Sequence, residues 1–129
     1  MILISAVITT GHSHQVLVKG FEEEYELLIS PAIMKEFRET LMDNPETFHM
    51  TLDEIQEETE TITYFGNYVL PDEEIDEIEN DPSDNVFLEA AVEGNADYIV
   101  SGDPHLQELG TFRGIDIVNP REFLDILDE

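Results

Sequence analysis

The chain of 129 residues contains no cysteine and no tryptophan, and only five of its residues are lysine or arginine. The absence of cysteine excludes disulfide bonds, thiolate nucleophiles and zinc–thiolate sites. Long apolar runs are also absent, because the N-terminal stretch "MILISAVI" is too short to span a bilayer and has no basic flank of the kind a signal peptide carries. We therefore expect a cytoplasmic protein that does not enter a membrane.

Acidic residues dominate what is present: 31 Asp and Glu give a net charge of −26. They are spread along the chain, as in "FEEEYE" and "PDEEIDEIEND", and are not gathered in one tail. Their mutual repulsion destabilises a small domain in dilute buffer, whereas molar salt shortens the Debye length to about 3 Å and removes most of the penalty. The pattern is typical of proteins from the salt-rich cytoplasm of an extreme halophile, and it does not identify a partner.

Hydrophobic residues make up 41% of the sequence, enough to bury a core, and the length predicts one domain over residues 1–129. The apolar patterns and turn signals alternate between helix and strand. Among the turn signals, Ser30 is an expected helix cap, Thr51 and Glu54 form a possible capping box, and Gly94 is expected to stop a helix. Expected helices cover residues 12–24, 31–43, 51–66, 83–95 and 120–129, and expected strands cover residues 25–30, 67–71, 96–102 and 114–120. This order predicts an α/β fold, a three-layer α/β/α sandwich with a mainly parallel sheet.

Asp103 stands just past the strand in "ADYIVSGDPHL", residues 96–106. Because Pro104 suits the first turn of a helix, one interpretation is that Asp103 caps that helix. The other is that it belongs to a ligand site, since ligands in α/β sheets bind beyond the carboxyl ends of strands. Asp84, at the start of the preceding helix, allows the same two interpretations. Glu36 shares a helical face with the apolar residue Ile33, an unusual place for a carboxylate.

These acids fall in a pattern that resembles a known family. The segment "DPSDNVFLEAAVEGNADYIVSGDPHL" is similar to the C-terminal half of PIN-domain nucleases, in particular the toxins of toxin–antitoxin systems. Those proteins carry an acidic loop, an acid that opens an Ala-rich helix, a strand of the type "ADYIVTGD" and a short helix. Upstream, "LLISPAIMKEFRETL" resembles the strand and helix that bear the family's second acid, and "FRGIDIVNPREFLDIL" resembles its closing strand and helix.

The resemblance implies roles for individual residues. Glu36, Asp84 and Asp103 match catalytic acids that hold divalent metal, and Asp81 matches a further acid of the loop. Ser101 stands where Thr is usual and implies a supporting hydroxyl. His105 replaces the usual second Asp of the last motif, so this chain lacks that carboxylate. A carboxylate set of this kind suits Mg²⁺ or Mn²⁺.

The function that the resemblance implies is metal-dependent endoribonuclease activity, in the toxin component of a toxin–antitoxin system. The implied partners are an RNA substrate, a cognate antitoxin protein and a second copy in a homodimer. Among the few basic side chains, Lys35 and Arg38 are the candidates for contacts with substrate phosphate. The alternative is a catalytically inactive PIN-like protein-binding module whose acids only cap helices.

The N-terminus departs from the family pattern. The family begins with an apolar strand that ends in Asp-Thr-Asn or Asp-Ser-Asn, followed by an apolar helix, and "MILISAVITTG" matches that helix. We therefore expect Ile2 to Ile8 to be helical, although propensity alone predicts a strand. The first strand and its catalytic Asp would then precede residue 1, through a misplaced start or through decay. In either case the chain as given would lack the central strand and would have little or no activity.

Overall fold

The computed structural model describes residues 2–5, 11–43, 46, 49–79 and 84–128. Its strands are β1 (Ile2–Ser5), β2 (Glu26–Ile29), β3 (Asn67–Tyr68), β4 (Tyr98–Val100), β5 (Thr111–Phe112) and β6 (Ile115–Val118). Its helices are α1 (Gly11–Phe21), α2 (Pro31–Asp43), α4 (Leu52–Phe65), α5 (Asn85–Glu93), α6 (Pro104–Leu109) and α7 (Pro120–Leu127). This alternation confirms an α/β fold. None of the described helices has the length and the apolar composition that crossing a bilayer requires.

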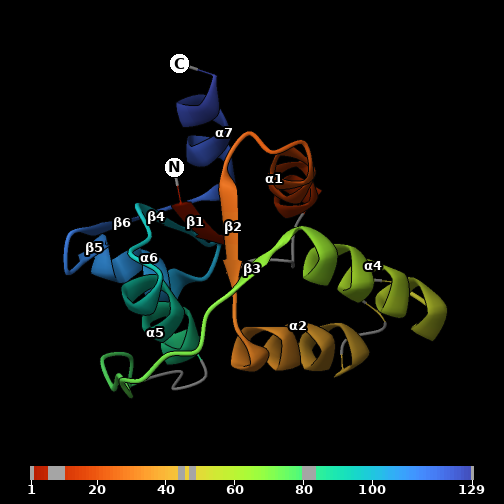
Figure 1. Ribbon diagram of the computed structural model, residues 1–129, viewed down its shortest axis with the longest axis horizontal. Coiled ribbons are helices and arrows are strands. Elements are labelled where there is room, and N and C mark those ends of the chain that lie inside the picture. Colours follow the sequence, from red (N-terminus) through yellow and green to blue (C-terminus); the bar gives the residue numbers. More distant parts are fainter. Residues whose placement is uncertain (1, 6–10, 44–45, 47–48, 80–83, 129) are drawn as a thin grey trace.

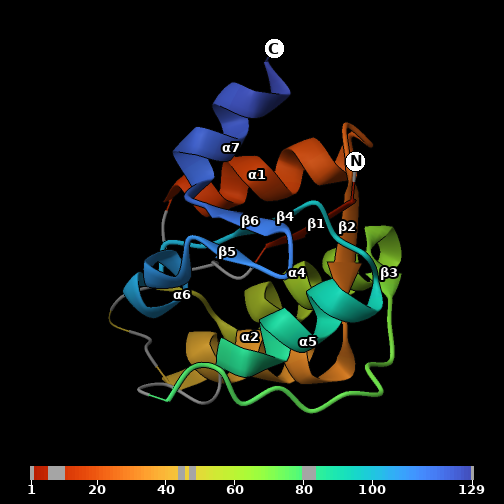
Figure 2. The same cartoon turned by 90° about the vertical axis from the view of Figure 1, so that its left-hand side faces the viewer.

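The six strands form one sheet in the order β3-β2-β1-β4-β6-β5 (Figure 1). Neighbouring strands run parallel except for β5, which pairs with β6 in an antiparallel hairpin. Figure 2 shows α1 and α7 on one side of the sheet and α2 and α5 on the other. Because parallel strands end at the same edge, the carboxyl ends of β1, β2 and β4 lie at one edge of the sheet.

The predicted helix over Ile2 to Ile8 is wrong in its described part, because Ile2–Ser5 is strand β1 (residues 6–10 lie outside the described residues). Strand β1 lies at the centre of the sheet, where Leu3 pairs with Leu27 of β2 and with Tyr98 of β4. A helix there would leave the facing backbone groups of both neighbours without partners, whereas an apolar strand satisfies them. The expectation that the sheet lacks its central strand is therefore also wrong.

The strands divide their side chains between two apolar clusters. Leu28 and Ile99 pack into one cluster with Leu88 of α5, and Leu27 and Val100 pack into the other. The second cluster also contains residues from four helices: Val16 and Leu17 of α1, Met34 and Phe37 of α2, Ile55 and Ile62 of α4, and Phe123 of α7. Consecutive residues of a strand point to opposite faces, so both faces of β2 and β4 are buried. This burial holds the carboxyl end of β4 in a fixed place.

Local signals set several of the helix ends. Ser30 caps α2, because its Oγ accepts the Ile33 N–H at 3.1 Å, and the predicted capping box of Thr51 and Glu54 is present at the start of α4. Helix α5 ends before Gly94, as predicted. Strand β5 was not predicted from the sequence, because two residues are too few to show the alternation of apolar and polar side chains that indicates a strand.

Candidate metal centre

Asp103 occupies the link between β4 and α6. It is the N-cap of α6, and its Oδ1 accepts the His105 N–H at 2.7 Å, so the predicted cap is confirmed. The buried Ser101 holds this link in place, because its Oγ accepts the Asp103 N–H at 2.9 Å. Capping engages one lone pair of a carboxylate that has about four, so the same side chain can also bind a cation.

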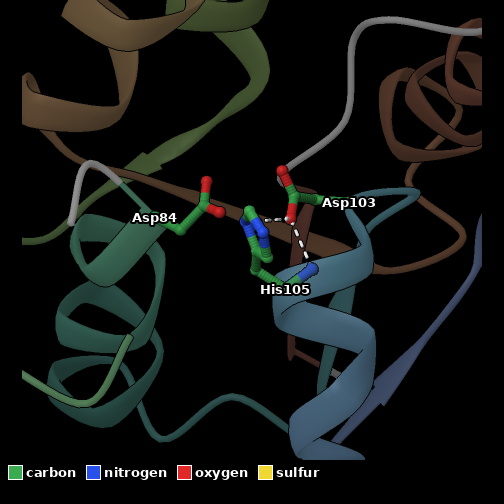
Figure 3. A group of neighbouring side chains, drawn as sticks. All are labelled: Asp84, Asp103 and His105. Carbon is green, nitrogen blue, oxygen red and sulfur yellow. Dashed lines mark hydrogen bonds and ion pairs between the residues drawn. The ribbon is translucent and has the colours of Figure 1, made fainter. Parts of the chain in front are cut away.

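Asp84 immediately precedes α5 and is only 8% exposed. Its backbone is already helical, with φ −72° and ψ −18°, and its side chain accepts no hydrogen bond from the start of the helix. The capping interpretation of Asp84 therefore does not describe its side chain. Figure 3 shows instead that the Asp84 carboxylate points toward the ring of His105.

Asp84, Asp103 and His105 form one group, although 19 positions separate the two acids in the sequence. One ligand atom from each side chain lies within 4.8 Å of those from the other two. His105 lies between the two carboxylates (Figure 3), and its Nδ1 is 3.6 Å from Asp103 Oδ1. That nitrogen is shielded from solvent and has no hydrogen-bond partner among the described residues. Two carboxylates and an imidazole that converge in this way are suited to a divalent cation.

Of the other predicted site residues, none that the structure describes joins this group. Glu36 is half-buried on α2 and does not belong to the group. Asp81 lies outside the described residues. Lys35 and Arg38, the predicted phosphate contacts, are exposed on α2, and Lys35 Nζ lies 3.9 Å from Glu39 Oε1. The roles of these four residues stay predictions.

Strand β1 brings no acid to the site, because the first Asp or Glu of the chain is Glu22. Residues 1–21 therefore offer no carboxylate side chain, and their ionisable side chains are those of His12, His14 and Lys19. Sequence reasoning treated His105 only as the loss of a carboxylate, and did not propose it as a ligand. The available signal was its position two residues after Asp103, in the first turn of a helix whose cap Asp103 provides.

A pocket of about 350 Å³ borders the group at His105. Its charged lining residues are Glu77, Glu79 and Glu108, and the apolar residues Ile78 and Leu109 complete it. A concave surface with several carboxylates attracts cations and repels a bare polyanion. An RNA phosphate would therefore need a bound cation in order to approach the site from this side.

A search against protein families gives one finding. A family model described as PIN domain matches residues 1–105. The matched stretch extends from β1 to the first turn of α6 and includes Asp84, Asp103 and His105. No curated protein matches the chain.

Proposed function

The chain belongs to the PIN domain family, whose members are generally nucleases that use divalent metals, and we propose that it is a metal-dependent endoribonuclease. One observation carries the proposal: Asp84, Asp103 and His105 converge within 4.8 Å at the carboxyl end of β4. This is where an α/β sheet binds its ligands.

A divalent cation fits this group. Asp84 is almost fully buried and faces the same small volume as Asp103, so the two negative charges repel each other in a poorly solvated place. Such a pair is costly for stability alone, and a cation relieves the cost. The buried His105 Nδ1, which has no hydrogen-bond partner among the described residues, also fits a ligand role.

Asp84 and Asp103 would hold the cation, which when bound activates water and stabilises negative charge on the phosphodiester. Ser101 keeps Asp103 in place through its hydrogen bond to the Asp103 backbone. The capping bond to the His105 N–H restricts the rotation of the Asp103 carboxylate. These contacts hold the ligands in place before a substrate arrives.

The acidic surface restricts how RNA binds. Within the part of the chain that the structure describes, three basic residues form ion pairs with acids: Lys19 with Glu24, Lys35 with Glu39, and Arg113 with Glu73. We propose that the cation and high salt carry most of the attraction for phosphate. Lys35 and Arg38 on α2 remain the proposed direct contacts.

The cellular role that we propose is that of a toxin controlled by an antitoxin protein, and it rests on the family resemblance described above. Its test is growth of a host that expresses the chain. We expect growth to stop when the chain is expressed alone and to resume when the gene adjacent to its own is expressed with it. The homodimer is likewise a proposal, and light scattering in molar KCl measures it.

A second candidate is a PIN-like protein-binding module. The observation that favours it is the absence of any acid in residues 1–21, which leaves β1 without a carboxylate for catalysis. For the same reason we expect cleavage by this chain to be slow.

The deciding experiment follows cleavage of a fluorescent single-stranded RNA in molar KCl with Mg²⁺, Mn²⁺ or Zn²⁺, each added separately. Asp84→Asn and Asp103→Asn each remove one charge while keeping the side-chain shape. The matched control is Asp116→Asn, the same change at an exposed position of β6 outside the group. We expect metal-dependent cleavage in the native chain and in the control, and its loss in the other two. No cleavage by the native chain would favour the binding module, and full cleavage by Asp84→Asn and Asp103→Asn would overturn this group as the catalytic site.

A further inference from the structure

The capping bond that begins α6 also determines where His105 lies. The His105 N–H donates to Asp103 Oδ1 at 2.7 Å, so the backbone of His105 is held directly beside that carboxylate. The imidazole then lies on the side of Asp103 that faces Asp84 (Figure 3). This placement follows from two rigid elements, the buried end of β4 and the first turn of α6.

His105 Nδ1 is in an unusual situation for a partly exposed side chain. About 38% of the side chain is accessible to solvent, yet Nδ1 itself is buried and has no hydrogen-bond partner among the described residues. Its separation of 3.6 Å from Asp103 Oδ1 is too long for a hydrogen bond. A polar atom shielded from water in this way costs free energy unless something binds it.

The separations within the group match those of ligands around one ion. Two atoms that each bind a metal at about 2.1 Å lie about 3.0 Å apart at a right angle and about 3.4 Å apart at the tetrahedral angle. The observed 3.6 Å between His105 Nδ1 and Asp103 Oδ1 is close to these values. All three ligand atoms lie within 4.8 Å of one another, so the separations beyond about 3.4 Å would have to shorten around one ion.

The chemistry of the three donors decides which ion they prefer. Mg²⁺ binds oxygen ligands in a strict octahedron, whereas imidazole suits borderline transition ions such as Zn²⁺. Catalytic zinc sites have three protein ligands and a further position for water, and nitrogen and carboxylate oxygen both serve as zinc ligands. Asp84, Asp103 and His105 would supply three such ligands, two carboxylates and one imidazole. We propose that His105 is a metal ligand, and that the group of Asp84, Asp103 and His105 selects Zn²⁺ over Mg²⁺. This inference rests on the proposed function only in that the same group binds a cation.

The test is calorimetric titration of the whole chain in molar KCl with Zn²⁺ and separately with Mg²⁺. The variants are His105→Ala, which removes the ligand, and His105→Asp, which makes the donor set all carboxylate. The matched control is His49→Asn, because His49 is an exposed histidine outside the group and Asn tolerates its φ of 53°. We expect His105→Ala to weaken Zn²⁺ binding by about tenfold or more, since loss of a mere supporting contact to a ligand already costs 10–100-fold. His105→Asp should bind Mg²⁺ more tightly than the native chain does.

A second readout uses only the native protein, so it does not depend on the variants folding. In the ¹⁵N spectrum of labelled histidine, Zn²⁺ should shift the ring nitrogens of His105 and leave those of His49 in place. Equal Zn²⁺ affinity in the native chain and in His105→Ala, with loss in Asp84→Asn and Asp103→Asn, would overturn the role of His105 and leave the metal site standing. Binding lost equally in His49→Asn would show adventitious surface binding and overturn the inference. No binding of either ion by the native chain would overturn this inference and the proposed metal site together.

Discussion

Asn85 and Ile78 are joined by two hydrogen bonds: the Ile78 N–H donates to Asn85 Oδ1 at 2.9 Å, and Asn85 Nδ2 donates to the Ile78 carbonyl oxygen at 3.1 Å. The same Oδ1 accepts the Glu77 N–H at 3.2 Å. Asn85 is 5% exposed and directly follows Asp84. One buried amide therefore ties the segment that lines the acidic pocket to the residue next to a candidate ligand.

Replacing Asn85 by Ala should lower the free energy of unfolding by about 2–4 kcal/mol, because it leaves two N–H groups and one carbonyl without their partner. Urea denaturation in molar KCl measures the change. The control is Asn67→Ala at an exposed position of β3, where a change within about 0.5 kcal/mol is expected. Equal values for the two variants would contradict the structural role of Asn85.

The environment of Tyr25 predicts that the folded chain loses stability at alkaline pH. Its hydroxyl donates to the Val16 carbonyl oxygen at 2.6 Å, its ring packs edge-on against Phe123 with centroids 5.2 Å apart, and burial raises the pKa of Tyr25 above its ordinary value of 10.0. The folded chain thus favours the neutral phenol. Its contribution to stability is complete below about pH 10 and is lost as the pH rises toward the pKa of the folded state.

We expect Tyr25→Phe to cost about 1 kcal/mol at pH 7, the value of one hydrogen bond, and to make the decline above pH 10 shallower. Thermal melts at several pH values measure both effects. The matched control is Tyr64→Phe, because Tyr64 is 80% exposed and should change neither quantity. A native-like alkaline decline in Tyr25→Phe would contradict this explanation.

Local sequence signals predicted most of the helices and strands. They failed for β1, whose conformation depends on the strands beside it. Ser30, Thr51 and Gly94 mark helix ends that the structure confirms, because capping acts over a few residues. The stretch Ile2–Ser5 was expected to be helix on the strength of a family motif, yet it is the central strand. Its apolar, β-branched run is compatible with a helix and with a strand, and pairing with the neighbouring strands β2 and β4 makes it a strand.

For a similar reason, only some residues of the candidate site could be predicted from the sequence. The positions of Asp84 and Asp103 at the starts of two helices indicated that both could meet at the edge of the sheet, and they do. Glu36 was selected from the face of its helix and from the family resemblance, and neither gives a distance to a side chain on another element. His105 was missed as a ligand because it was compared only with the Asp that it replaces in the family pattern, although the expected cap at Asp103 already placed it beside that carboxylate.

The net charge of −26 predicts that the fold depends on salt. In dilute buffer the repulsion among 31 acids acts over tens of ångströms, whereas in molar KCl the Debye length is about 3 Å. Unfolding moves the charges apart, so their repulsion opposes the folded state most at low salt. We expect the melting temperature to rise by on the order of 10 °C from dilute buffer to molar KCl, which corresponds to a few kcal/mol in a domain of this size.

A charge variant separates screening from the general effects of salt on protein surfaces. Glu57→Lys combined with Asp116→Lys replaces two exposed negative charges by positive ones on α4 and β6. Because less repulsion is left to screen, this variant should melt higher than the native chain in dilute buffer and gain less from added KCl. Exclusion of salt from the surface would raise both proteins equally, so parallel curves would contradict electrostatic repulsion as the cause.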